Sequence, residues 1–215
     1  MLLPLHESFT DEAVVFVVDD DASVRVSLQR LIHAAGWKVE SYASAQEFFD
    51  RQLSEANGCI VLDLQMPGLD GLHAYERMQG VGCHLPVIFL TGYGDVPSSV
   101  AAMKQGAIDF LQKPVDDNVL LQTIDRAMAY QVTMRKADAL KATAERKLAS
   151  LSRRERDVLH GVLLGKLNKQ IAADLGIAEK TVKVHRGRVM LKTGARTIAG
   201  LMLICADAGV HAPHN

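Results

Sequence analysis

The segment from Cys59 to Gly71 constrains the fold more than any other part of the sequence. It opens with a short apolar run that ends at Leu62, passes through Asp63, and continues into a loop containing Pro67 and two glycines. Such a run, bounded by turn-forming residues, predicts a buried strand with Asp63 at its carboxyl end. In an open parallel sheet, ligands bind at that edge. Asp63 is therefore either a functional carboxylate or a plain cap of the following helix.

Apolar runs and helical patterns alternate through the first 130 residues. Strands are predicted at 13–18, 39–42, 59–62, 85–91 and 108–111. Helices are predicted between them, with Ser23 as a possible cap of the first and with Ser44 and Glu47 as a capping box for the second, which should reach about Leu53. A further helix should run from about Pro97 to Gln105. The alternation predicts an α/β fold with a doubly wound, five-stranded parallel sheet.

Polar groups stand at matching strand ends. Asp19 and Asp20 follow the first strand, Asp63 the third, Thr91 the fourth and Lys113 the fifth. Parallel strands end at one edge, so we expect these groups to converge there. Clustered carboxylates favour Mg²⁺, which takes oxygen ligands, and a nearby ammonium and hydroxyl suit phosphoryl oxygens. The set is typical of an aspartate that accepts a phosphoryl group, although Lys113 and Thr91 taken singly fit a surface ion pair and a strand cap.

Four motifs together resemble the receiver domain of two-component response regulators over about residues 13 to 130. They read Val-Val-Asp-Asp-Asp, Val-Leu-Asp-Leu-Gln-Met-Pro-Gly-Leu-Asp-Gly, Leu-Thr-Gly-Tyr-Gly-Asp and Phe-Leu-Gln-Lys-Pro. The resemblance implies that a sensor histidine kinase phosphorylates Asp63. It also implies a magnesium site formed by the Asp20 and Asp63 side chains and the Gln65 backbone carbonyl, with Asp19 assisting through water.

The same resemblance assigns roles at the fourth and fifth strands. Thr91 matches the switch hydroxyl, Phe110 the switch aromatic and Lys113 the phosphate-binding lysine. Phosphorylation would draw Thr91 inward and let Phe110 turn into the vacated space, which is a shift between two populated states. Phe110 fits a plain core position as well.

The charge distribution predicts a second domain with a different partner. Residues 1–130 hold 8 Lys/Arg and 18 Asp/Glu, a net −10, whereas the remainder holds 16 and 7, a net +9. The basic part could meet nucleic acid or an anionic surface. We find neither a secretory signal nor a run long enough for a membrane helix, and therefore expect a cytoplasmic protein without a membrane partner. The three scattered cysteines fit reduced packing residues better than a zinc site.

A helical pattern without Gly or Pro runs from Asp116 through Lys147, and its thinning apolar positions predict a helical linker over 131–147. Ser152 and Glu155 form a capping box for the next helix. Asn168 could cap a second helix, and Glu179 starts a third after a short glycine turn. This is the helix-turn-helix pattern. The outward face of the third helix should carry a set of basic side chains: Lys180, Lys183, Arg186, Arg188 and Lys192.

Residues 148–209 resemble the LuxR-type helix-turn-helix of NarL and FixJ response regulators, through Leu-Ser-Arg-Arg-Glu, Asn-Lys-Gln-Ile-Ala, Leu-Gly-Ile-Ala and Thr-Val-Lys-Val-His. The resemblance implies a dimerisation helix near 197–208 and places Lys183 and Val184 against base edges. Other side chains are candidates for DNA contact, chiefly with phosphate: Lys169, Lys180, Thr181, His185 and Arg188. Gly187 stands where relatives carry a basic residue, and glycine inside a helix lowers helix stability by about 1 kcal/mol relative to alanine. It either permits close backbone approach or narrows base readout.

We therefore expect a response regulator and not an enzyme, with a receiver domain at 13–130 and a DNA-binding domain at 148–215. Phosphorylation of Asp63 should promote a homodimer that binds a two-fold symmetric DNA site and acts on RNA polymerase. Two alternatives compete with this interpretation. A phosphatase could use the Asp-x-Asp spacing of Asp19 and Asp21 with Lys113, but Asp63 and the helix-turn-helix would then have no role. A transcription factor triggered by a small ligand or protein contact would leave the acidic set unexplained.

Overall fold

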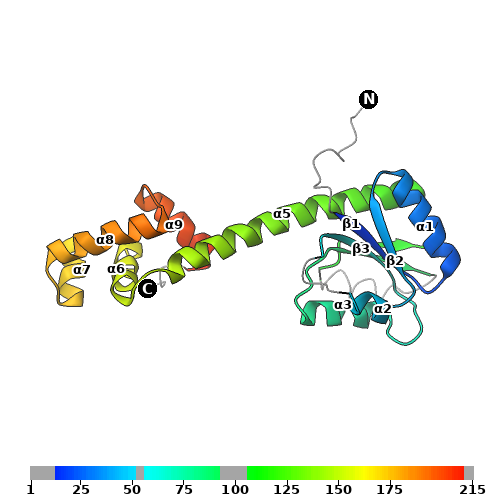
Figure 1. The fold of residues 1–215 in the computed structure, drawn as a ribbon, viewed down its shortest axis with the longest axis horizontal. Helices are drawn as coiled ribbons and strands as arrows, with labels where there is room; N and C mark the ends of the chain where they lie inside the picture. The colour runs from blue at the N-terminus through cyan, green and yellow to red at the C-terminus, as the bar shows by residue number, and fades with distance from the viewer. Residues whose placement is uncertain (1–12, 52–55, 93–105, 211–215) are drawn as a thin grey trace, which may run out of the picture. The chain divides into compact units, whose positions relative to one another are not determined.

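The computed structural model describes residues 13–51, 56–92 and 106–210, and it divides into two compact units with a boundary between Met134 and Arg135 (Figure 1). The predicted helix at 97–105 and the end of the second predicted helix lie outside the described residues. Each unit is described below by itself.

The first unit is built on a five-stranded parallel sheet. Its strands are β1 (Val14–Val18), β2 (Lys38–Tyr42), β3 (Gly58–Asp63), β4 (Val87–Thr91) and β5 (Asp109–Gln112). The order is β2-β1-β3-β4-β5, and each pair of neighbours is parallel. Since β1 lies between β2 and β3, the order reverses beside the ends of β1 and β3. The doubly wound, five-stranded prediction is confirmed, with strand bounds shifted by one or two residues.

Helices pack on both faces of this sheet. On one face, Val17 and Val61 share a core with α1 (Ala22–Ala34) and α5 (Asp117–Ala149); on the other, Phe16 and Ile60 pack with α2 (Ala45–Phe49) and α3 (Gly71–Gly80) (Figure 1). Successive strand residues point to opposite faces, so an unbroken apolar run supplies both cores. Burial on both faces fixes the register and with it the position of each strand end.

The second unit consists of the last part of α5 and four further helices: α6 (Arg153–Leu163), α7 (Asn168–Leu175), α8 (Glu179–Thr193) and α9 (Ile198–Asp207). Its core joins them through Val158, Ile171, Val182 and Leu201, all buried. Gly176 takes the left-handed conformation (φ 61°) that ends α7 and opens the turn into α8. The predicted helix-turn-helix and the fourth helix are confirmed.

Two predicted helix caps are wrong. Asp21, not Ser23, caps α1, because its carboxylate accepts the Ser23 N–H at 2.7 Å. Asn168 is the first residue of α7, not its cap, since its side chain binds Arg186 instead. Ser152 and Glu155 form the expected capping box of α6.

At α2, Ser44 caps the helix as predicted, but Glu47 accepts from Ala43 N–H and leaves the reciprocal bond of a capping box unmade.

In the described part of the chain, no single helix is long and apolar enough to cross a membrane. The pair α8 and α9 satisfies that test only when the two helices are joined, and a 57° bend separates them.

Candidate functional site

Three carboxylates meet at the edge of the sheet where β1 and β3 end. Asp19 and Asp20 directly follow β1, and Asp63 is the last residue of β3. One carboxylate oxygen from each lies within 4.8 Å of the others. Asp19 and Asp63 are buried, whereas Asp20 is exposed. The structure thus brings together the acidic residues that the sequence predicted would converge.

Lys113, which follows β5, reaches this acidic cluster. Its Nζ lies 2.6 Å from Asp19 Oδ2 and 2.9 Å from Asp63 Oδ2. Burial of the ammonium acts to lower its pKa, but the two carboxylate contacts prevail and the pKa of Lys113 is raised. Burial also raises the pKa of the Asp19 carboxyl, against the opposing effect of Lys113. One cation facing three carboxylates leaves a net negative charge, which favours a further cation at this edge.

Thr91 and Phe110 lie on the strands next to this cluster. Thr91 ends β4, is buried, and donates its hydroxyl hydrogen bond to the Gly92 carbonyl at 3.0 Å. The Phe110 ring on β5 is partly buried, with its centroid 6.0 Å from that of Phe89. The Thr91 hydroxyl is thus bonded to its neighbouring backbone, and the Phe110 ring packs against the edge of the core.

The loop after β3 holds Asp63 by its backbone. The Gln65 N–H donates to Asp63 Oδ1 at 3.2 Å, while the Gln65 side chain is exposed. A Cβ added at Gly71 would lie 2.4 Å from the Asp63 carbonyl oxygen, so only glycine allows α3 to begin this close to the strand end. Residue type marked Gly71 only as a loop glycine, and its close approach to the strand end was missed.

Arg25 was also missed. Its guanidinium donates from Nη1 to the carbonyl oxygens of Asp19 and Asp20, at 2.7 and 2.9 Å. Arg25 lies in the first turns of α1, so it ties the acidic loop to the helix that follows it. The only sequence signal was a basic residue a turn beyond three consecutive aspartates.

The second unit presents a basic surface on α7 and α8. Most of the predicted DNA-contacting side chains are exposed there: Lys169, Lys180, Thr181, Lys183, Val184 and Arg188. His185 is half-buried, and its Nδ1 is buried without a hydrogen-bond partner among the described residues. An exposed, positively charged helix face suits the negatively charged phosphate backbone of a duplex.

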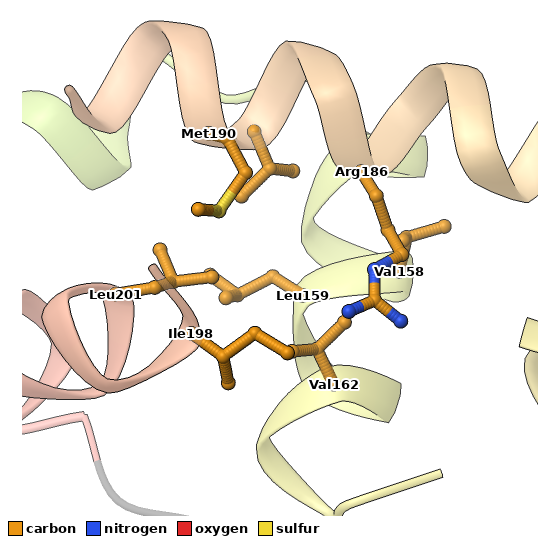
Figure 2. A pocket seen from close by; sticks show the side chains of 8 residues that line it. Val158, Leu159, Val162, Arg186, Met190, Ile198 and Leu201 are labelled. Atoms are coloured by element: carbon orange, nitrogen blue, oxygen red, sulfur yellow. The ribbon is translucent and has the colours of Figure 1, made fainter. Parts of the chain in front are cut away.

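Two basic residues predicted on the same face make contacts within the second unit instead. Arg186 donates to Asn168 Oδ1 at 2.6 Å and lies beside Val158 and Val162 of α6, in an apolar pocket between α6, α8 and α9 (Figure 2). Lys192 binds Glu155 Oε2 at 2.7 Å and the Ser150 carbonyl at 3.1 Å. The prediction of an outward position is wrong for Arg186, whereas Lys192 is exposed as predicted but is paired with a residue far away in sequence.

Two family models match the chain. Residues 15–125 match the response regulator receiver domain, and residues 149–205 match the bacterial regulatory proteins of the luxR family. The chain belongs to the NarL/FixJ class of two-component response regulators. It is 41% identical to nodulation protein W of Bradyrhizobium diazoefficiens, over 98% of this chain and 92% of that protein. It is 39% identical to FixJ of the same species, over 94% of this chain and 98% of that protein.

Solved structures agree with this assignment. The response regulator StyR matches with a TM-score of 0.80 at 41% identity, covering 91% of this chain and 98% of that one. Full-length FixJ from B. japonicum matches with a TM-score of 0.57 at 39% identity, covering 93% of this chain and 98% of that one. As a response regulator, the chain joins a receiver to a LuxR-type DNA-binding domain and regulates transcription; its family is one of transcriptional regulators, not classical enzymes.

Proposed function

We propose that this response regulator is switched by phosphorylation of Asp63 by a sensor histidine kinase. The supporting observation is the position of Asp63, buried at a strand end with Lys113 Nζ at 2.9 Å and two further carboxylates within 4.8 Å. A carboxylate held in this way is a nucleophile for a phosphoryl group, and Lys113 offsets the charge of the incoming oxygens. Asp63, Lys113, Thr91 and Phe110 form the reactive and switching set.

The acidic cluster fits Mg²⁺, because its three carboxylates offer hard oxygen ligands around a net negative charge. The ion would be held by the Asp20 and Asp63 side chains and the Gln65 carbonyl, with Asp19 assisting through water. When bound, it supplies positive charge that lowers the repulsion between Asp63 and a phosphate donor. Gly71 and Arg25 are positioning residues in this scheme, since they fix the backbone on either side of the cluster.

Thr91 and Phe110 would carry the signal away from Asp63. Thr91 has to give up its bond to the Gly92 carbonyl in order to donate to a phosphoryl oxygen. The space it leaves would admit the Phe110 ring, which is already partly buried beside Phe89. The phosphorylated and resting receivers would then differ at the surface around β4 and β5, and that difference would promote homodimer formation.

The dimer would place two LuxR-type domains on a two-fold symmetric DNA site and act on RNA polymerase. In each domain Lys183 and Val184 would face base edges, while the surrounding exposed residues contact phosphate: Lys169, Lys180, Thr181 and Arg188. His185 would contribute from its half-buried position. We assign the receiver to 13–130, the linker to 131–147 and the DNA-binding domain to 148–215, which the family matches and the break after Met134 support.

Intact-mass spectrometry tests the phosphoacceptor. The full chain is incubated with acetyl phosphate and Mg²⁺, alongside Asp63→Asn and a metal-free control. We expect one phosphoryl mass gain in the unmodified chain, none in Asp63→Asn, and none without the metal. A gain that persists in Asp63→Asn would place the nucleophile elsewhere.

A further inference from the structure

Gly187 has no structural reason to be glycine within its own domain. It lies in the middle of α8, where glycine is among the least favourable residues because it adds backbone entropy to the unfolded chain. Its backbone does not take the left-handed conformation that makes glycine necessary at Gly176 and Gly194, which end α7 and α8. Turn formation therefore does not account for it.

Close packing does not account for it either. Gly161, in the last turn of α6, shows what a packing glycine looks like: a Cβ there would lie 2.7 Å from Ile171 Cγ1 on α7. A Cβ at Gly187 would meet nothing within 4 Å, and the residue is exposed. The domain would thus gain helix stability from alanine at this position and lose no internal contact.

The position of Gly187 on α8 shows where its missing side chain matters. Lys183 and Val184 precede it by four and three residues, which places them on the same side of the helix. Both are exposed, and Val184 is 48% exposed although it is apolar. The buried side of α8 holds Val182 and Val189 instead. Gly187 therefore lies on the side of α8 that faces the DNA in the proposed function.

We propose that Gly187 is a specificity-determining residue whose bare backbone lets α8 seat closely against the base edges. Without a Cβ at this point, α8 can approach the floor of the major groove closely. Lys183 and Val184, which lie one helical turn before Gly187, can then reach the bases. Sequence readout then rests on the Lys183 ammonium and the Val184 methyl groups, which suit guanine acceptors and the thymine methyl. A methyl group at position 187 would hold the helix away from the groove floor.

The proposal makes Gly187→Ala raise helix stability while it lowers specific DNA affinity. Amide hydrogen exchange in α8 should slow about four- to fivefold, because alanine favours the helix by that factor. Binding to a duplex site enriched by the unmodified chain from a randomised library should weaken at least about tenfold. The slope of affinity against salt should stay the same, since no phosphate contact is removed.

The experiment uses the full chain with acetyl phosphate and Mg²⁺. Gly80→Ala is the matched control, since Gly80 is also a helical glycine with open space at its Cβ position, but on α3 of the first unit. Its DNA affinity should equal that of the unmodified chain. A second selection with Gly187→Ala should enrich sequences that differ from the original site at the base pairs next to Lys183 and Val184.

Equal or tighter binding by Gly187→Ala, with the same enriched sequences, would overturn the proposal. An equal loss in Gly80→Ala would overturn it as well, because the effect would not come from α8. The inference rests on the proposed DNA-binding function, and the two fail differently. If the unmodified chain enriches no sequence at all, the proposed function is wrong; if it enriches a site that Gly187→Ala reads equally well, only the role of Gly187 is wrong.

Discussion

Removing the exposed carboxylate of the acidic cluster should stabilise the metal-free receiver. The Asp20 carboxylate lies within 4.8 Å of those of Asp19 and Asp63, and Lys113, which contacts both of these, offsets one of their two negative charges. The Arg25 guanidinium at the Asp19 and Asp20 carbonyl oxygens offsets a further part of the repulsion. At 4.8 Å, one further negative charge is repelled by about 0.9 kcal/mol in bulk water, and by more if the local dielectric is lower. Asp20→Asn should therefore raise the free energy of unfolding by up to about 1 kcal/mol, which corresponds to at most about 3–5 °C in the melting temperature.

Calorimetry of the full chain, with EDTA or with Mg²⁺, measures this change. The unmodified receiver should gain stability as Mg²⁺ rises, by about 2.7 kcal/mol at a concentration one hundred times the dissociation constant. Asp20→Asn should lose most of that gain, because one ligand is missing. The two proteins should therefore change order, with the variant more stable in EDTA and less stable in Mg²⁺.

Asp21→Asn is the matched control for this prediction. Asp21 is the next residue and is also an exposed carboxylate, but its side chain caps α1 through the Ser23 N–H. Asparagine caps a helix about as well as aspartate, so stability and the response to Mg²⁺ should both stay close to those of the unmodified chain. A variant Asp20→Asn that melts lower in EDTA, or that keeps the full response to Mg²⁺, would refute the reasoning.

Three further predictions concern the DNA-binding unit. The Lys192 contact and, after it, the hydrogen bond from the Ser152 N–H lower the pKa of Glu155 to about 2. The ionised carboxylate therefore stabilises the fold above about pH 4.5, and this stabilisation is lost as the pH falls toward 2. Glu155→Gln should flatten the acid limb of stability against pH, as followed by circular dichroism. Gly161→Ala should cost about 1–2 kcal/mol in urea unfolding despite its gain in helix propensity, because the new Cβ meets Ile171; an unchanged midpoint would contradict this. In titrations at several salt concentrations, Lys169→Ala should lower affinity for all duplexes and reduce the salt slope by about one, whereas Lys183→Ala should cost about 1–3 kcal/mol at one base position and relax specificity there.

The sequence predicted the sheet and the convergence at its edge because both follow from strong local patterns. An apolar run buried on both faces of a parallel sheet has few alternative placements, and each such run here ends in a polar residue. Asp19, Asp63 and Lys113 are far apart in the chain, yet their shared position at strand ends was enough to bring them together. Gly71 and Arg25 were missed because they act through backbone contacts, which residue type alone does not reveal.

The errors arose where two neighbouring polar residues could do the same task or where the partner lay far away. Asp21 and Ser23 can both cap α1, and only the backbone geometry distinguishes them. The charge pattern of α8 gave no sign that Lys192 binds Glu155, which lies 37 residues earlier. Asn168 was expected to cap α7, but the guanidinium of Arg186, 18 residues later, occupies its side-chain oxygen.

The dependence of DNA affinity on phosphorylation of Asp63 tests the central claim most directly. The full chain and Asp63→Asn are each treated with acetyl phosphate and Mg²⁺, phosphorylation is verified by intact mass, and binding to a duplex enriched by the phosphorylated chain is measured at one fixed salt concentration. We predict that phosphorylation tightens binding of the unmodified chain and leaves Asp63→Asn unchanged. Equal affinity of the phosphorylated and unphosphorylated chain would contradict the account.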